Sequence, residues 1–213
     1  MNVVLHKVMF VTMVAISLMM TGCVAPTQQL SDADRGKLKA ASINATVQKP
    51  AGMFLLAPGS SVGLMFGAIG GALSAGGIED SRKAFTAFAE KNSISIEKIV
   101  REEVELALRE SGKIVIANPG DAATPTINIT VQQYGFGVTN LLGSKVVPVL
   151  TIKCDMVDNG GKVLWSSSDR MGPSIANPME STTWESMRDN PKLIEEQWRK
   201  ASRYLAKKIV SEL

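Results

Sequence analysis

The sequence predicts an α+β fold in which an antiparallel sheet, ordered as a meander, carries helices packed on one face. Two patterns lead to this class. Residues 126–134 and 146–157 alternate apolar and polar side chains, which indicates strands with one buried and one wet face. Residues 79–111 and the C-terminal segment instead repeat apolar side chains with the period of a helix. Because the strands follow one another and helices flank them, we expect helices to cover one face of a single sheet.

The N-terminal part of the domain is expected to supply one strand. Residues 24–36 are polar and aperiodic, which is typical of a tether. Residues 42–48 alternate, with Ile43, Ala45 and Val47 on one side, and this pattern predicts the first strand.

The helical region at residues 79–111 is expected to form two helices, because residues 92–95 interrupt its pattern. Ser95 is a good N-cap for the second helix, and Gly112 suits the position after its last turn. The predicted buried stripe of this helix comprises Ile96, Ile99, Val100, Val104, Ala107 and Leu108. Opposite charges spaced four apart on its other face predict a solvated surface.

The predicted sheet follows this helix. Residues 113–117 form a short apolar strand, and the two alternating strands come next. Residues 158–161 are strong turn formers and return the chain as a last strand at 162–168. Cys154 shares the apolar face with Leu150, Ile152 and Met156, so we expect it to be a core residue and not a nucleophile.

A helix is expected to close the domain. Asn190 can cap it, and Pro191 suits its first position, where the missing N–H does no harm. Its apolar stripe comprises Ile194, Trp198, Ala201, Leu205 and Ile209.

Composition argues against catalysis and against nucleic-acid binding. The formal net charge is only +3, and the single histidine, His6, lies in the N-terminal leader described below. Without histidine, the rest of the chain has no Ser-His or Cys-His pair and no histidine metal ligand. We therefore predict no catalytic residue, no metal site and no cofactor.

The N-terminus predicts the cellular address. Lys7 is followed by an apolar run at residues 8–20, as in a secretory signal. The sequence Met20-Thr21-Gly22-Cys23 then resembles the lipobox of bacterial lipoproteins, although Met20 stands where leucine is usual. This resemblance implies cleavage before Cys23 and lipidation of that cysteine. No aspartate follows Cys23, which resembles export to the outer membrane. The expected organisation is a signal peptide at 1–22, a lipid anchor and tether at 23–40, and one α+β domain at 41–213.

The domain resembles a group of envelope proteins through three segments. These are LRESGKIVIANP, TINITVQQYGF and VLTIKCDMVDNGGKVLWSSSDR, and the likeness covers roughly residues 94–170, with a possible extension to residue 213. They resemble the domains of the curli secretion lipoprotein, the TolB amino-terminal domain and the lipoprotein activator of penicillin-binding proteins. The resemblance implies a fold and a protein-binding role, and it carries over no catalytic residue.

Residues 51–78 carry no charge and contain a glycine-rich segment. Gly63, Gly67, Gly71 and Ala75 recur at every fourth position, a pattern that lets helix backbones approach closely. Three interpretations remain open: packing against the domain itself, contact with a membrane, and a seam between copies of the chain. Such glycine-rich apolar segments also give a looser resemblance to TraT-like surface-exclusion lipoproteins.

We therefore predict an outer-membrane-anchored periplasmic lipoprotein that acts by binding. Its membrane contact is the lipid anchor, and its expected partner is an envelope protein. The alternative is an oligomeric, membrane-inserting lipoprotein of export or surface-exclusion type that uses the glycine zipper.

Overall fold

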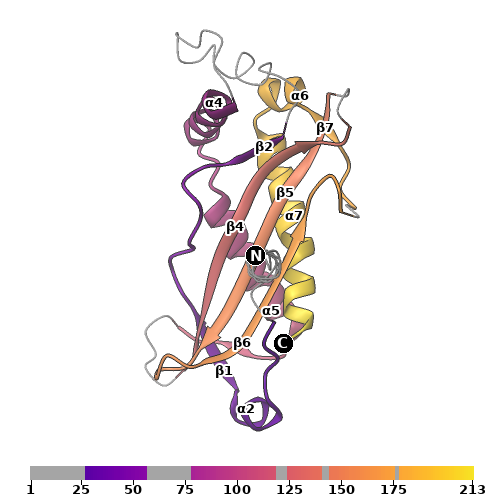
Figure 1. Ribbon diagram of the computed structural model, residues 1–213. Coiled ribbons are helices and arrows are strands. Elements are labelled where there is room, and N and C mark those ends of the chain that lie inside the picture. Colours follow the sequence, from indigo (N-terminus) through magenta and orange to yellow (C-terminus); the bar gives the residue numbers. More distant parts are fainter. Residues whose placement is uncertain (1–26, 57–77, 119–123, 141–143, 176–177) are drawn as a thin grey trace, which may run out of the picture.

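The computed structural model describes residues 27–56, 78–118, 124–140, 144–175 and 178–213. Within these residues, a seven-stranded sheet and several helices form one α+β unit (Figure 1), which confirms the predicted class. The strands are β1 (Ala40–Ile43), β2 (Phe54–Leu56), β3 (Val115–Ile116), β4 (Thr126–Val138), β5 (Lys145–Val157), β6 (Val163–Met171) and β7 (Thr182–Thr183). The helices are α2 (Asp32–Lys37), α4 (Ile78–Lys91), α5 (Ile96–Ser111), α6 (Trp184–Asp189) and α7 (Lys192–Ser211).

The sheet is mixed, which corrects the expectation of a purely antiparallel meander. Strands β4, β5 and β6 do form an antiparallel meander, and β7 adds to β5 in the same sense. However, β1 and β2 both pair with β4 in parallel, and β1 also pairs with β3 in parallel. The reason is topological: α4 and α5 carry the chain back along the sheet before β3 and β4 begin, and such a crossover joins parallel strands.

Helices α5 and α7 cover one face of the sheet, as expected. The alternating strand residues point their apolar side chains at these helices, and Ile127, Ile152, Cys154 and Met156 are no longer exposed to solvent. Helix α7 contacts β5 and β6, whereas α5 contacts β3 and β4. The predicted helix break is confirmed, since α4 ends at Lys91 and α5 begins at Ile96.

Local capping also follows the sequence. Ser95 Oγ accepts a hydrogen bond from Lys98 N, and Gly112 adopts a left-handed conformation with φ of 63°. The last helix begins slightly later than expected, because Asn190 closes α6 and Pro191 precedes α7. Such shifts of one or two residues are common at helix ends.

An ionic cluster joins α5 to α7. Glu103 is only 2% exposed, yet it accepts hydrogen bonds from Arg199 (3.1 Å) and Arg203 (2.7 Å). Glu102 and Glu195 also contact Arg199, each at 2.9 Å. The carboxylates raise the pKa of both arginines, and Glu103 remains paired although it is buried. The cluster fixes the two helices together and needs no functional interpretation.

Candidate functional site

The sequence-predicted site residues lie outside the described residues. This applies to Cys23, the predicted lipidation site, and to the predicted glycine-zipper residues Gly63, Gly67, Gly71 and Ala75. Their roles stay predictions. The structure does describe where the chain enters and leaves these segments, and the candidate site is built from those boundaries.

The chain is fixed to the sheet soon after Cys23. Gln28 pairs with Ser166 on the outer edge of β6 through two backbone hydrogen bonds, Gln28 N to Ser166 O at 2.8 Å and Ser166 N to Gln28 O at 2.9 Å. The Gln28 side chain adds a third bond, from Nε2 to Val163 O at 2.8 Å. Leu30 then enters the core and is only 5% exposed. Residues 28–30, which the sequence analysis placed in the tether, are thus bound to the domain.

Helix α2 continues this docking. Ser31 caps the helix, because its Oγ accepts a hydrogen bond from Asp34 N at 3.1 Å and donates one to Asp34 Oδ2 at 2.7 Å. Arg35 Nη1 donates to the Leu213 carbonyl oxygen at 2.6 Å, which ties α2 to the C-terminal end of α7. Lys162, in the turn before β6, reaches Asp34 at 3.7 Å. Two elements remote in sequence therefore hold α2 in place.

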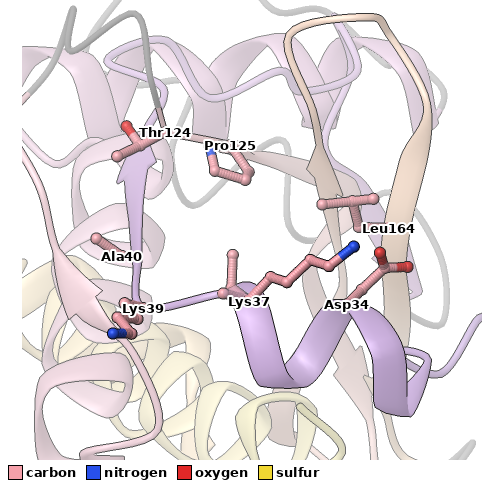
Figure 2. Close-up of a pocket in the computed structure, with 8 residues that line it drawn as sticks. Asp34, Lys37, Lys39, Ala40, Thr124, Pro125 and Leu164 are labelled. Atoms are coloured by element: carbon pink, nitrogen blue, oxygen red, sulfur yellow. The ribbon is translucent and has the colours of Figure 1, made fainter.

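An open hollow of about 300 Å³ lies between α2, the start of β1 and the start of β6. We call it the anchor-side hollow. Its apolar lining comes from Leu38, Pro125 and Leu164, and its charged lining from Asp34, Lys37 and Lys39. Figure 2 shows the Lys37 side chain reaching across the hollow toward Asp34 and Leu164, whereas the Lys39 amine points away on the other side.

Among the described residues, the hollow is lined by more lysine than acidic side chains. The hydrogen bond from Ser31 is the main cause that lowers the pKa of Asp34, and nearby Lys162 and Lys37 lower it further, so Asp34 is ionised at neutral pH. Lys162 already pairs with this carboxylate. Among the described residues, Lys37 and Lys39 have no ion-pair or hydrogen-bond partner. Lys37 therefore lies in the hollow near Asp34, and Lys39 lines its rim with the amine directed outward.

Two other hollows lie on the outer surfaces of α5 and α7, away from the docked N-terminus. A groove of about 500 Å³ runs along the solvent side of α5 beside Val47, and Glu97, Glu102 and Glu105 contribute to its lining. A second groove of about 460 Å³ lies on α7, where Arg203 and Lys207 are lined up beside Tyr204. In that groove Arg203 and Lys207 are already paired, with Glu103 and Glu110 respectively, whereas Lys200 also lines it and forms no ion pair among the described residues.

The uncharged stretch is fixed at the opposite end of the domain. Met53 and Leu55 are only 2% and 5% exposed, and β2 runs beside β4 at Gly135. Helix α4 returns the chain at the same end and contacts β2 (Figure 1). Phe85 of α4 packs edge-on against Phe136 and Trp184, with ring centroids 5.8 and 5.9 Å apart. β2 and α4, the elements that flank residues 57–77 in the sequence, thus lie at the same end of the domain.

The docked N-terminus and the uncharged stretch are far apart. Gln28 pairs with Ser166 of β6, Ser166 pairs with Asp155 of β5, and Asp155 pairs with Asn128 of β4. Leu56 instead pairs with Gly137 of β4. The nine residue steps from Asn128 to Gly137 correspond to about 30 Å of strand. Figure 1 shows α2 at one end of the domain, and β2, α4 and α6 at the other.

The described residues offer little catalytic chemistry. Cys154 is fully buried, as predicted, and burial raises the pKa of its thiol to about 12. Within the described ranges, no group of three or more His, Cys, Asp or Glu side chains could hold a metal ion. Among those same residues, no helix is both long and apolar enough to cross a membrane.

Comparisons with known proteins find structural similarity only. No family model matches the chain, and no curated protein matches it as a relative. The PelC dodecamer from Paraburkholderia phytofirmans is 13% identical, with 88% of this chain and 96% of that chain covered and a TM-score of 0.42. A Xanthomonas campestris protein assigned to DUF330 is 11% identical, with 88% and 89% covered and a TM-score of 0.42.

A third solved structure is the lipoprotein GNA1162 from Neisseria meningitidis. It is 16% identical, with 66% of this chain and 88% of that chain covered and a TM-score of 0.24. Because all three TM-scores lie below 0.5, these similarities carry no argument about the function of this chain. The resemblances to the curli, TolB and TraT-like groups stay predictions.

Proposed function

We infer that this chain is a lipoprotein of the bacterial outer membrane, anchored through Cys23, whose periplasmic α+β domain binds an envelope protein and performs no catalysis. The signal and lipobox-like sequence supply the address. The buried thiol of Cys154 and the structurally engaged Glu103 cluster support binding over catalysis, because neither offers a reactive group to solvent.

The observation that carries this proposal is the separation between the docked N-terminus and the uncharged stretch. An anchor at Cys23 would hold the α2 end near the membrane, because Gln28 is bound to β6 only five residues later. The uncharged stretch begins and ends about 30 Å further along the strands. A domain arranged in this way holds that stretch away from its own anchor, where a partner protein can reach it.

The far end is rigid enough to present such a segment. The rings of Phe136 and Trp198 stack with centroids 5.7 Å apart, and Trp184 meets Phe136 edge-on at 6.1 Å. These rings come from β4, α6 and α7, so three elements are locked together beside β2 and α4. A rigid platform lowers the entropy that partner binding would otherwise lose.

Lipidation is tested directly at Cys23. The Cys23→Ala variant, expressed beside the wild-type chain, should accumulate as unprocessed precursor and lose incorporation of a palmitate analogue. Equal labelling of both proteins would refute the anchor.

Partner binding is tested at the far end. A photo-crosslinking residue at position 185, on exposed Glu185 of α6, should capture an envelope protein in intact cells. The capture should vanish when residues 57–77 are replaced by a linker that joins β2 to α4, two elements that contact each other. The same residue at position 36 of α2 serves as the control. Products at multiples of the chain's own mass would favour the oligomeric alternative, and unchanged capture after the deletion would refute a role for the stretch.

A further inference from the structure

We propose that the α2 end of the domain rests on the bilayer, and that the anchor-side hollow receives the phosphate of an anionic lipid headgroup from the anchoring leaflet. The inference rests on the proposed lipidation of Cys23, and it names a second, non-covalent membrane contact. That contact would set the orientation of the domain.

The first argument is the reach of the tether. Five residues separate Cys23 from Gln28, and a fully extended chain of this length spans at most about 17 Å. Three hydrogen bonds to β6 prevent Gln28 from lengthening the tether. Leu30 is buried and α2 follows directly, so the whole segment up to Lys37 moves with the domain. The lipid therefore stays within about 17 Å of the β6 edge.

The second argument is the position of the hollow relative to this attachment point. Leu164, which lines the hollow, lies on β6 two residues from Ser166, which binds Gln28. Asp34 and Lys37 line it from α2, the helix that follows the docked segment. The hollow thus lies at the end of the domain that the tether holds nearest to the membrane.

The third argument is charge. Lys37 and Lys39 are exposed and form no hydrogen bond or close ion pair among the described residues, although Lys37 reaches toward Asp34 and the Lys39 amine points outward (Figure 2). Lys162 is 65% exposed although it contacts Asp34. Around the hollow, the three cations Lys37, Lys39 and Lys162 thus outnumber the two α2 carboxylates, Asp32 and Asp34. Lysines close to an anionic bilayer are attracted to its phosphates, and this attraction fades within a Debye length. Leu38, Pro125 and Leu164 complete the hollow with surface suited to the glycerol and first methylenes below a headgroup.

Orientation is tested with the full acylated chain in vesicles that contain phosphatidylglycerol and a headgroup spin-label quencher. A fluorophore is placed at Gly36→Cys, where a Cβ meets no atom within 4 Å, or at exposed Glu185→Cys at the other end. Cys154 remains unlabelled, because it is fully buried. The label at position 36 should be strongly quenched, and the label at position 185 only weakly.

The lysines are tested in the same vesicles. Lys37→Ala combined with Lys39→Ala should lower the ratio of docked to undocked domains roughly 30-fold, given the usual attraction per lysine. The matched control combines Lys83→Ala and Lys192→Ala, which removes two exposed lysines at the far end that form no ion pair among the described residues. This control should leave quenching at position 36 unchanged. Replacement of phosphatidylglycerol by phosphatidylcholine should reproduce the effect of the Lys37 and Lys39 changes.

Three results would overturn the proposal. They are equal quenching at positions 36 and 185, stronger quenching at position 185, and equal effects of the two lysine pairs. Mass spectrometry of Cys23 separates this failure from failure of the anchor. An acylated chain with the wrong quenching pattern overturns only the orientation, whereas a chain without acyl groups overturns the lipoprotein assignment as well.

Discussion

Replacement of Gly135 by alanine should release β2, and with it the start of the uncharged stretch. Gly135 has φ of 145°, a backbone conformation that side chains rarely adopt. A Cβ there would lie 1.8 Å from the Phe54 carbonyl oxygen and 2.8 Å from the Phe54 carbonyl carbon. These are backbone atoms of the strand that pairs with β4, so β2 itself would have to move.

The magnitude follows from two contributions. The unfavourable φ costs about 1–3 kcal/mol. Displacement of β2 then exposes part of Met53 and Leu55, and loss of a buried Leu or Met side chain costs about 2–5 kcal/mol. Because a displaced β2 would expose Met53 and Leu55 only in part, we expect a total destabilisation of roughly 3–5 kcal/mol. A domain of this kind has a typical stability of ~5–15 kcal/mol, so the loss would be a large fraction.

The assay is denaturant unfolding together with native-state proteolysis of the segment around Phe54. Gly135→Ala should lower the free energy of unfolding and should make this segment cleavable before the rest of the domain. Gly36→Ala is the matched control, because its Cβ meets no atom within 4 Å and alanine favours a helix interior by up to ~1 kcal/mol. A Gly135→Ala protein that unfolds within about 0.5 kcal/mol of wild type would refute the close β2–β4 approach.

Three further predictions concern the core and its charges. Trp165 and Trp198 are each 1% exposed, so either change to alanine should destabilise by about 3–5 kcal/mol in urea unfolding, and unaltered midpoints would contradict the sheet–helix packing. Burial opposes ionisation of Glu97, but the hydrogen bonds from Lys49 and Ser95 outweigh it and lower its pKa. A carboxylate with a lowered pKa stabilises the fold above its unfolded pKa of about 4.3. The small advantage in unfolding free energy of wild type over Lys49→Ala should therefore shrink as pH falls through the folded pKa of Glu97, and a constant difference would contradict the pairing. Cys154 should react with a thiol reagent at neutral pH only as fast as the domain unfolds, and rapid reaction of the folded protein would contradict its burial.

Much of the sheet and both long helices could be predicted, because periodicity is a local property. The alternation at Ile127, Ile129 and Val131 reports a buried strand face without any knowledge of its neighbours. The parallel pairing of β1 and β2 with β4 could not be predicted in this way. It depends on where α4 and α5 return the chain, and a one-dimensional pattern does not contain that information.

The docked N-terminal segment was harder to predict than the core. The sequence Ser31-Asp32-Ala33-Asp34 does contain a capping signal, since a Ser side chain followed three residues later by an acidic one can close a helix start. A helix of six residues has too few positions to show a periodic stripe, however. The contacts that fix it, Gln28 to Ser166 and Arg35 to Leu213, join residues more than a hundred positions apart.

The two ends of the long strands differ on the face away from α5 and α7. At the α2 end that face is polar: Asn128 accepts a hydrogen bond from Asn44 at 2.9 Å, and Lys153 pairs with Asp155 at 2.8 Å. Toward the far end, Val147 and Val149 on the same face are only 4% and 5% exposed. The expectation of one wet face thus holds for half of the sheet.

Close packing at the far end explains this change. A Cβ on Gly137 would lie 2.9 Å from Pro173 Cγ and 3.3 Å from Val149 Cγ2, so the segment after β6 presses onto the sheet there. The opposite face carries the stacked Phe136 and Trp198 rings. Because this end of the sheet is covered on both faces, it forms a thick, rigid block beside β2 and α4, the elements that flank residues 57–77. Met53, Leu55 and Phe85 contribute buried side chains to this block, so both elements that flank residues 57–77 are packed into the core.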